Sequence, residues 1–210
     1  MRKQRQLWGL VAVAVGFALL IGGVATASNM GFKFVPSIGA NQAFNLSLPW
    51  NNNYTNAKSL LTDLPGVSRV ARFNANSSLT NWTPTSDPSQ NFSIVKGSSY
   101  VAFAGTGGSN TAVIVGSHDP NFTFSFTANQ AFNAAAPYHQ TLTNAKGLLN
   151  DLNTKLGAGS IARVAKFTAG STLQNWTPTS DPSQNFNLDL GMGVIIFPSQ
   201  TKSGYVWPHY

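Results

Sequence analysis

An internal duplication constrains this chain more than any other feature of its sequence. The twelve residues NWTPTSDPSQNF occur identically at positions 81–92 and 175–186. Other matching segments precede them, so the two copies together cover nearly all of the chain after its first 30 residues. Self-similarity on this scale predicts one architecture that is built twice. We therefore expect two repeats, at residues 31–120 and 121–210.

Each repeat is predicted to be mainly β, with one short helix. Apolar residues recur at helical spacing over 57–64 and again over 145–152, and Pro65-Gly66 ends the first of these stripes. The segments 67–73 and 161–167 have the pattern of strands. Glycine-rich turns near the end of each repeat predict that the closing strands form a hairpin. The expected fold class is a pair of tandem homologous β-sandwich or barrel-like units, which can share a core because the linker between them is very short.

The start of the chain has the pattern of a secretory signal. Three cations within the first five residues precede an uncharged apolar run from Leu7 to Val24, and small residues follow. This predicts a signal peptide over residues 1–27, cleaved after Ala27, and a protein that is secreted or held at the cell surface. An uncleaved anchor is the alternative, because the run approaches the about 20 residues that cross a bilayer. In that case the signal segment is the protein's membrane contact.

The remaining chain is polar but weakly charged. Of the 13 Lys and Arg residues, removal of the signal leaves ten against six acids, and all six acids are aspartate. The cations are scattered, which argues against a nucleic-acid partner. After Ala27 there are 21 Asn, 21 Ser and 17 Thr residues. Such surfaces hydrate well and repel one another weakly, so self-association into an oligomer or fibre is expected.

Residue types that carry catalysis are scarce. The chain has no cysteine and no glutamate, which removes thiolate chemistry and the commonest carboxylate pairs. The three histidines, His118, His139 and His209, are far apart in sequence and show no metal-ligand spacing. Each is predicted to be a surface imidazole that acts alone. We expect no catalytic residues, no cofactor and no metal site.

The duplicated loop is the best sequence candidate for a binding site. Each copy places a tryptophan beside amides, hydroxyls and a carboxylate, which suits stacking on a sugar ring with hydrogen bonds around it. The candidate residues are Asn81, Trp82, Asp87, Asn175, Trp176 and Asp181. The alternative interpretation is structural: the tryptophan fills the core of its unit, and the Ser-Asp-Pro-Ser segment makes Asx turns that fix the loop.

A second candidate surface follows the linker. Phe122, Phe124 and Phe126 alternate with polar residues, so a strand here carries three aromatic rings on one face. An exposed face of this kind predicts self-association, whereas a buried one is ordinary core.

Several segments together resemble a family of repeats. FNLSLPWNNNYTNAKSLLTDL, then VARFN, a loop bearing tryptophan, and a closing YVAF are similar to the tandem repeats of secreted, mostly uncharacterised bacterial proteins. The resemblance covers nearly the whole chain after the signal, and it implies an extracellular, non-catalytic module without assigning a role to any residue. The predicted function is a secreted structural or adhesive protein that self-associates. Glycan binding through the loop tryptophans is the alternative.

Overall fold

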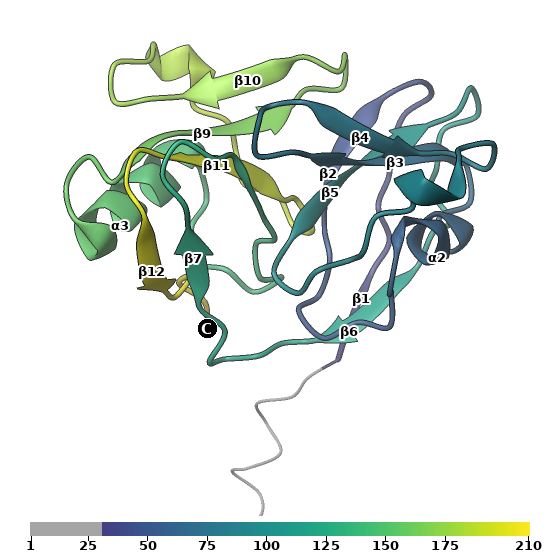
Figure 1. Cartoon of the computed structure of the whole chain (residues 1–210), viewed down its shortest axis with the longest axis horizontal. Helices are drawn as coiled ribbons and strands as arrows, with labels where there is room; N and C mark the ends of the chain where they lie inside the picture. The colour runs from purple at the N-terminus through teal and green to yellow at the C-terminus, as the bar shows by residue number, and fades with distance from the viewer. Residues whose placement is uncertain (1–30) are drawn as a thin grey trace, which may run out of the picture. The chain divides into compact units, whose positions relative to one another are not determined.

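The structure, a computed structural model, describes residues 31–210 (Figure 1). The predicted signal segment, residues 1–27, lies outside the described residues. Within 31–210, none of the helices has the length and apolar character needed to cross a membrane.

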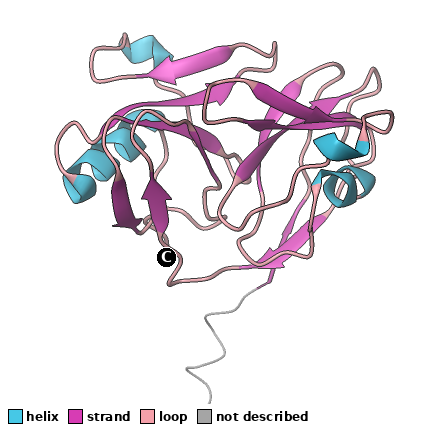
Figure 2. Cartoon of the chain, in the orientation of Figure 1, coloured by secondary structure: helices cyan, strands magenta, loops and turns pink. Residues whose placement is uncertain are grey.

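The prediction of a mainly β fold with one short α-helix in each unit is confirmed (Figure 2). The first unit contains β1 (Gly31–Phe34), β2 (Ala43–Ser47), α2 (Ala57–Thr62), β3 (Val67–Phe73), β4 (Leu79–Trp82), the 3-10 turn η1 (Pro88–Gln90), β5 (Ser99–Ala104) and β6 (Ile114–Ser117). The second unit contains β7 (Phe124–Phe126), β8 (Phe132–Ala134), α3 (Ala145–Leu156), β9 (Ile161–Phe167), β10 (Leu173–Trp176), the 3-10 turn η2 (Pro182–Gln184), β11 (Val194–Pro198) and β12 (Lys202–Tyr205). The order of elements is the same in both.

Each unit has a four-stranded and a two-stranded antiparallel sheet. The larger sheets have the equivalent orders β2-β5-β3-β4 and β8-β11-β9-β10. The smaller sheets pair β1 with β6 and β7 with β12. The predicted closing hairpins are therefore wrong, because the last strand of each unit pairs with the first strand of that unit and not with its neighbour in sequence.

The helices begin where the sequence predicts. Asn56 caps α2 by accepting a hydrogen bond from the Ser59 N–H at 2.9 Å, and Asn144 caps α3 by accepting one from the Gly147 N–H at 2.8 Å. α3 is twice as long as α2, since it spans 12 residues against 6. Its extra turns come from residues inserted in the second copy.

The larger sheets are buried on both faces. In β5, Tyr100 and Ala102 point into the core of the first unit, while Val101 and Phe103 point the other way into a third apolar cluster. That cluster also contains side chains from β9 and β11 of the second unit, such as Phe167. Because successive side chains on a strand face opposite sides, the two sheets pack against each other while each still covers its own core.

Several polar contacts across this junction come in reciprocal pairs. The buried Asn45 side chain donates to the Phe167 carbonyl at 2.6 Å and accepts from the Phe167 N–H at 2.9 Å. Asn133, at the equivalent position of the second unit, donates to the Phe73 carbonyl of the first. The Ser47 N–H donates to the Gly191 carbonyl, and the equivalent Ala135 N–H donates to the Gly97 carbonyl, both at 2.8 Å. Each unit thus holds the other partly through equivalent contacts.

Two glycines allow a close approach of the units. Gly97 and Gly191 have positive φ values of 76° and 71°. A Cβ atom at Gly97 would overlap the ring of Phe122, and one at Gly191 would overlap the ring of Phe34. Each ring belongs to the opposite unit, so these contacts are also exchanged reciprocally.

The expectation of an exposed aromatic face on 122–126 is wrong. Phe124 and Phe126 are each 1% exposed in the core of the second unit. Phe122 is partly buried, with its ring centroid 4.9 Å from that of Trp50. The strand pairs with β12, and its apolar face turns inward, leaving Ser125 on the exposed side.

We expect Asn45→Ala to destabilise the protein by about 2–3 kcal/mol, because a buried N–H and a buried carbonyl of Phe167 lose their partner. Urea unfolding followed by tryptophan fluorescence measures this loss. Asn110→Ala is the control, because Asn110 is exposed, and it should change stability by less than about 0.5 kcal/mol. Equal effects of the two substitutions would contradict the role assigned to Asn45.

Candidate functional site

The duplicated loop does not present its tryptophans to solvent. Trp82 is 7% exposed and Trp176 is 6% exposed, and each indole packs in the core of its own unit. The expectation of an exposed stacking face is therefore wrong for both. The structural interpretation of these residues accounts for their position, since an indole at the end of an outer strand closes the core beneath it.

The polar residues of the loop bond within the chain. Asp87 accepts a hydrogen bond from the Ser89 N–H and Asp181 from the Ser183 N–H, both at 2.8 Å. Hydrogen bonding from the serine side chain, and then from its backbone N–H, holds the pKa of each carboxyl below its usual value. Asn91, at the end of the loop, accepts from the Lys58 N–H at 2.9 Å in the first turn of α2. The loop is thereby fixed to the helix, and the second unit repeats the arrangement.

Asn81 and Asn175 lie beside these tryptophans, on the outer strands β4 and β10. Their Oδ1 atoms are buried and accept no hydrogen bond from the part of the chain that the structure describes. Both residues face their own strand neighbours on β3 and β9. The structure does not combine Asn81, Trp82 and Asp87, or their second copies, into an open sugar site.

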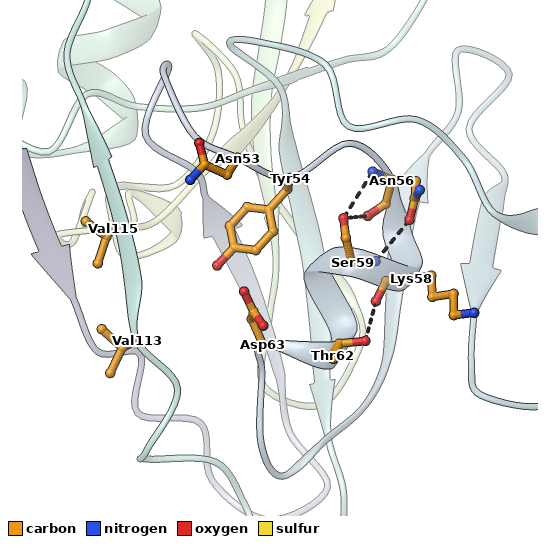
Figure 3. A pocket seen from close by; sticks show the side chains of 9 residues that line it. All are labelled: Asn53, Tyr54, Asn56, Lys58, Ser59, Thr62, Asp63, Val113 and Val115. Carbon is orange, nitrogen blue, oxygen red and sulfur yellow. Dashed lines mark hydrogen bonds between the residues drawn. The ribbon is translucent and has the colours of Figure 1, made fainter.

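A separate groove in the first unit is open to solvent (Figure 3). Tyr54 and Asp63 point towards one another on one side of it, and Val113 and Val115 line the other. Burial and then the Asp63 charge raise the pKa of Tyr54 above its usual value, so its hydroxyl remains protonated and able to donate. No sequence pattern predicts this groove, because its two walls lie about 50 residues apart in the chain.

The three histidines of the chain meet in one cluster. Every pair of their ligand atoms lies within 4.8 Å. The ring centroid of His118 is 4.3 Å from that of His139 and 4.3 Å from that of His209, and the latter two centroids are 5.2 Å apart. The prediction that these imidazoles act separately on the surface is therefore wrong. His118 is also buried, with 8% exposure.

Three distant segments bring the imidazoles together. His118 follows β6, and its carbonyl accepts a hydrogen bond from Asn51 Nδ2 at 3.2 Å. The chain end pairs with the loop before α3: the Tyr210 N–H donates to the His139 carbonyl, and an isolated bridge joins Gln140 to His209. No local pattern predicts this meeting, because it depends on where the C-terminal residues lie in the folded protein.

The surroundings favour the uncharged form of His118 and His139. Burial, and then the neighbouring His139 and His209, lower the pKa of His118 to about 4. Burial also lowers the pKa of His139 from its usual value. The buried ring of Trp50 lies beside the cluster, with its centroid 5.0 Å from that of His118. Neutral imidazole is the form that binds transition metals, so the cluster has the chemistry to hold an ion.

One arginine on β3 and one on β9 contact aromatic rings of the neighbouring strands. The Arg69 guanidinium lies over the Phe103 ring at 3.7 Å and the Arg163 guanidinium lies over Phe197 at 3.9 Å. These contacts are cation–π interactions within each sheet.

Comparison with known proteins gives no family or function: no family model, curated protein or solved structure matches this chain.

We expect Trp82→Ala and Trp176→Ala each to destabilise the protein by roughly 3–5 kcal/mol, because each removes a buried indole and leaves a cavity. Trp82→Phe retains an aromatic ring in the core and should lose clearly less stability. Tyr210→Ala is the control, since Tyr210 is 84% exposed. Urea midpoints measure the series. A Trp82→Ala protein as stable as the Tyr210→Ala protein would show that the indole is not a core residue.

Proposed function

We propose that this protein is an exported, non-catalytic structural or adhesive protein that self-associates at the cell surface or in the extracellular matrix. The proposal rests on the hydrogen bonds that the duplicated polar residues make within the fold. Asp87 caps the turn η1, Asn91 holds the start of α2, and Asn45 bridges the units. Residues that are duplicated in order to hold a fold together are typical of a structural building block.

The surface composition supports self-association. A surface rich in Asn, Ser and Thr with few charges offers weak repulsion between copies. Phe122, Phe124 and Phe126 are no longer candidates for the contact, because they pack inside the protein. Val113 and Val115 are proposed to form this contact instead. They are 40% and 59% exposed, and both line one wall of the groove in Figure 3.

The proposal is tested by expressing the full chain in a bacterial host and recovering the protein from the culture medium. We expect the recovered protein to begin at Ser28 and to sediment as oligomers at high concentration. The double substitution Val113→Lys and Val115→Lys should shift it to monomer, because like charges would then face each other between copies. Sedimentation velocity and N-terminal sequencing provide the measurements.

The matched control replaces Val95 and Leu190 by lysine, since these side chains are similarly exposed, at 53% and 58%, but lie outside the groove. This control should still associate. Wild-type protein that is monomeric at every concentration would reject self-association, and retention of the uncut chain inside the cell would reject export.

Polysaccharide binding is a second candidate function, favoured by the groove rather than by the buried tryptophans. Tyr54 offers a half-buried ring, Asp63 offers acceptor oxygens, and Asn53 offers an amide. An aromatic ring flanked by such polar groups is suited to stacking on a sugar and bonding its hydroxyls.

For this candidate we expect Tyr54→Ala to weaken binding to a retained polysaccharide by about threefold to tenfold, the loss of one aromatic contact. Affinity electrophoresis in gels containing a panel of polysaccharides measures it. Tyr210→Ala and Trp82→Phe are controls and should leave retention unchanged. Equal retention of the Tyr54→Ala and wild-type proteins would place any binding elsewhere.

A further inference from the structure

The histidine cluster is not explained by the structural role of the repeats. The chain has three histidines in all, and none of them lies in a segment that is identical in the two repeats. His139 corresponds to Asn51 of the first unit, and His118 lies in the linker. They nevertheless meet at one place, where ring packing is the contact they share. Three imidazoles gathered from three segments need a reason other than the stability of either unit.

The orientation of two of the rings suits a shared ion. His209 Nδ1 lies 2.6 Å from the Trp207 carbonyl, to which it donates, so its Nε2 lone pair faces away from that bond. A ring nitrogen that donates to a backbone carbonyl is the usual arrangement behind a metal-binding histidine. His118 Nε2 is buried and has no hydrogen-bond partner among residues 31–210. A buried acceptor of this kind is costly unless something binds it.

The spacing of the donor atoms is close to what an ion requires. Ligand nitrogens about 2.0–2.1 Å from a tetrahedral metal ion are separated by about 3.3 Å. The ligand atoms here lie within 4.8 Å of one another. His139 and His209 are only partly buried, so side-chain rotations at the solvent side can close the difference. The backbone contacts that hold the segments need not change.

The donor set selects the class of metal. Three neutral imidazoles suit zinc, copper and nickel, whereas calcium and magnesium prefer oxygen ligands. Asp119, the acid next to His118 in the sequence, forms a 2.6 Å ion pair with Lys96. Its carboxylate is therefore paired with a lysine.

We propose that His118, His139 and His209 bind one divalent transition-metal ion, such as Zn²⁺, with water in the remaining coordination position. The ion would join the linker between the units, the loop before α3 and the C-terminal segment. Because it binds the folded arrangement and not the unfolded chain, it stabilises the folded protein by an amount that grows with the logarithm of its free concentration above the dissociation constant. This inference stands independently of the proposed self-association.

The experiment uses protein expressed without a histidine tag and freed of metal by a chelator that is then removed. Titration with Zn²⁺ and, separately, with Cu²⁺ is followed by calorimetry and by thermal unfolding. We expect one ion per chain and, at a hundredfold excess over the dissociation constant, a rise in Tm of about 5–10 °C. The Cu²⁺ complex should show imidazole nitrogen couplings in its electron paramagnetic resonance spectrum.

His209→Ala and His139→Ala are the diagnostic substitutions, since both side chains are partly exposed and their loss should leave the metal-free fold intact. Each should weaken Zn²⁺ affinity at least tenfold and abolish the metal-dependent rise in Tm, while the metal-free Tm stays close to that of the wild type. Tyr210→Ala is the matched control: it changes the same chain end but keeps the three imidazoles.

Absence of saturable binding of either ion by the folded wild-type protein would overturn the proposal. Binding of equal strength in the wild-type, His139→Ala and His209→Ala proteins would overturn it as well, because the ion would then be held elsewhere. Mg²⁺ and Ca²⁺ at the same concentrations should not raise the Tm, and an equal rise with Ca²⁺ would show that the site is not built from imidazole.

Discussion

The reciprocal packing of the two larger sheets is the constraint on which the rest of the structure depends. One face of each sheet covers its own unit, and the other face meets the opposite sheet in a shared apolar cluster. Asn45 supplies the central polar contact by satisfying both backbone groups of Phe167. Since those groups are buried, the contact specifies one alignment of the units as well as holding them together. The units therefore behave as halves of one body.

This arrangement decides where unusual chemistry can occur. None of the three histidines takes part in the reciprocal contacts described above. Trp50 joins the junction to the histidine cluster: its Nε1–H donates to the Ala135 carbonyl across the junction, and its ring lies against His118. The histidines thus lie beside the packed junction.

The sequence predicted the parts of the fold that depend on local spacing. The apolar stripe over 57–64 and its end at Pro65-Gly66 predicted α2, and the strand patterns predicted the mainly β units. The prediction of a closing hairpin was wrong because a glycine-rich turn indicates that the chain reverses direction. It does not indicate which strand the next strand pairs with. The sequence pattern at 122–126 predicted a two-faced strand, which the structure has over 124–126, yet it could not tell which face points inward. Trp82 was equally ambiguous, because an indole suits both a core and a sugar site.

By itself the sequence determined that one unit is built twice, that each is mainly β with a single short helix, and that charge contributes little to its surface. These properties follow from periodicity and composition, which act along the chain and over short distances. Only the tertiary structure decided that the duplicated loop turns its tryptophans inward and that His118, His139 and His209 share one location. Burial and proximity between distant segments are set by how sheets stack and where the chain end docks, and no spacing along the chain encodes them directly.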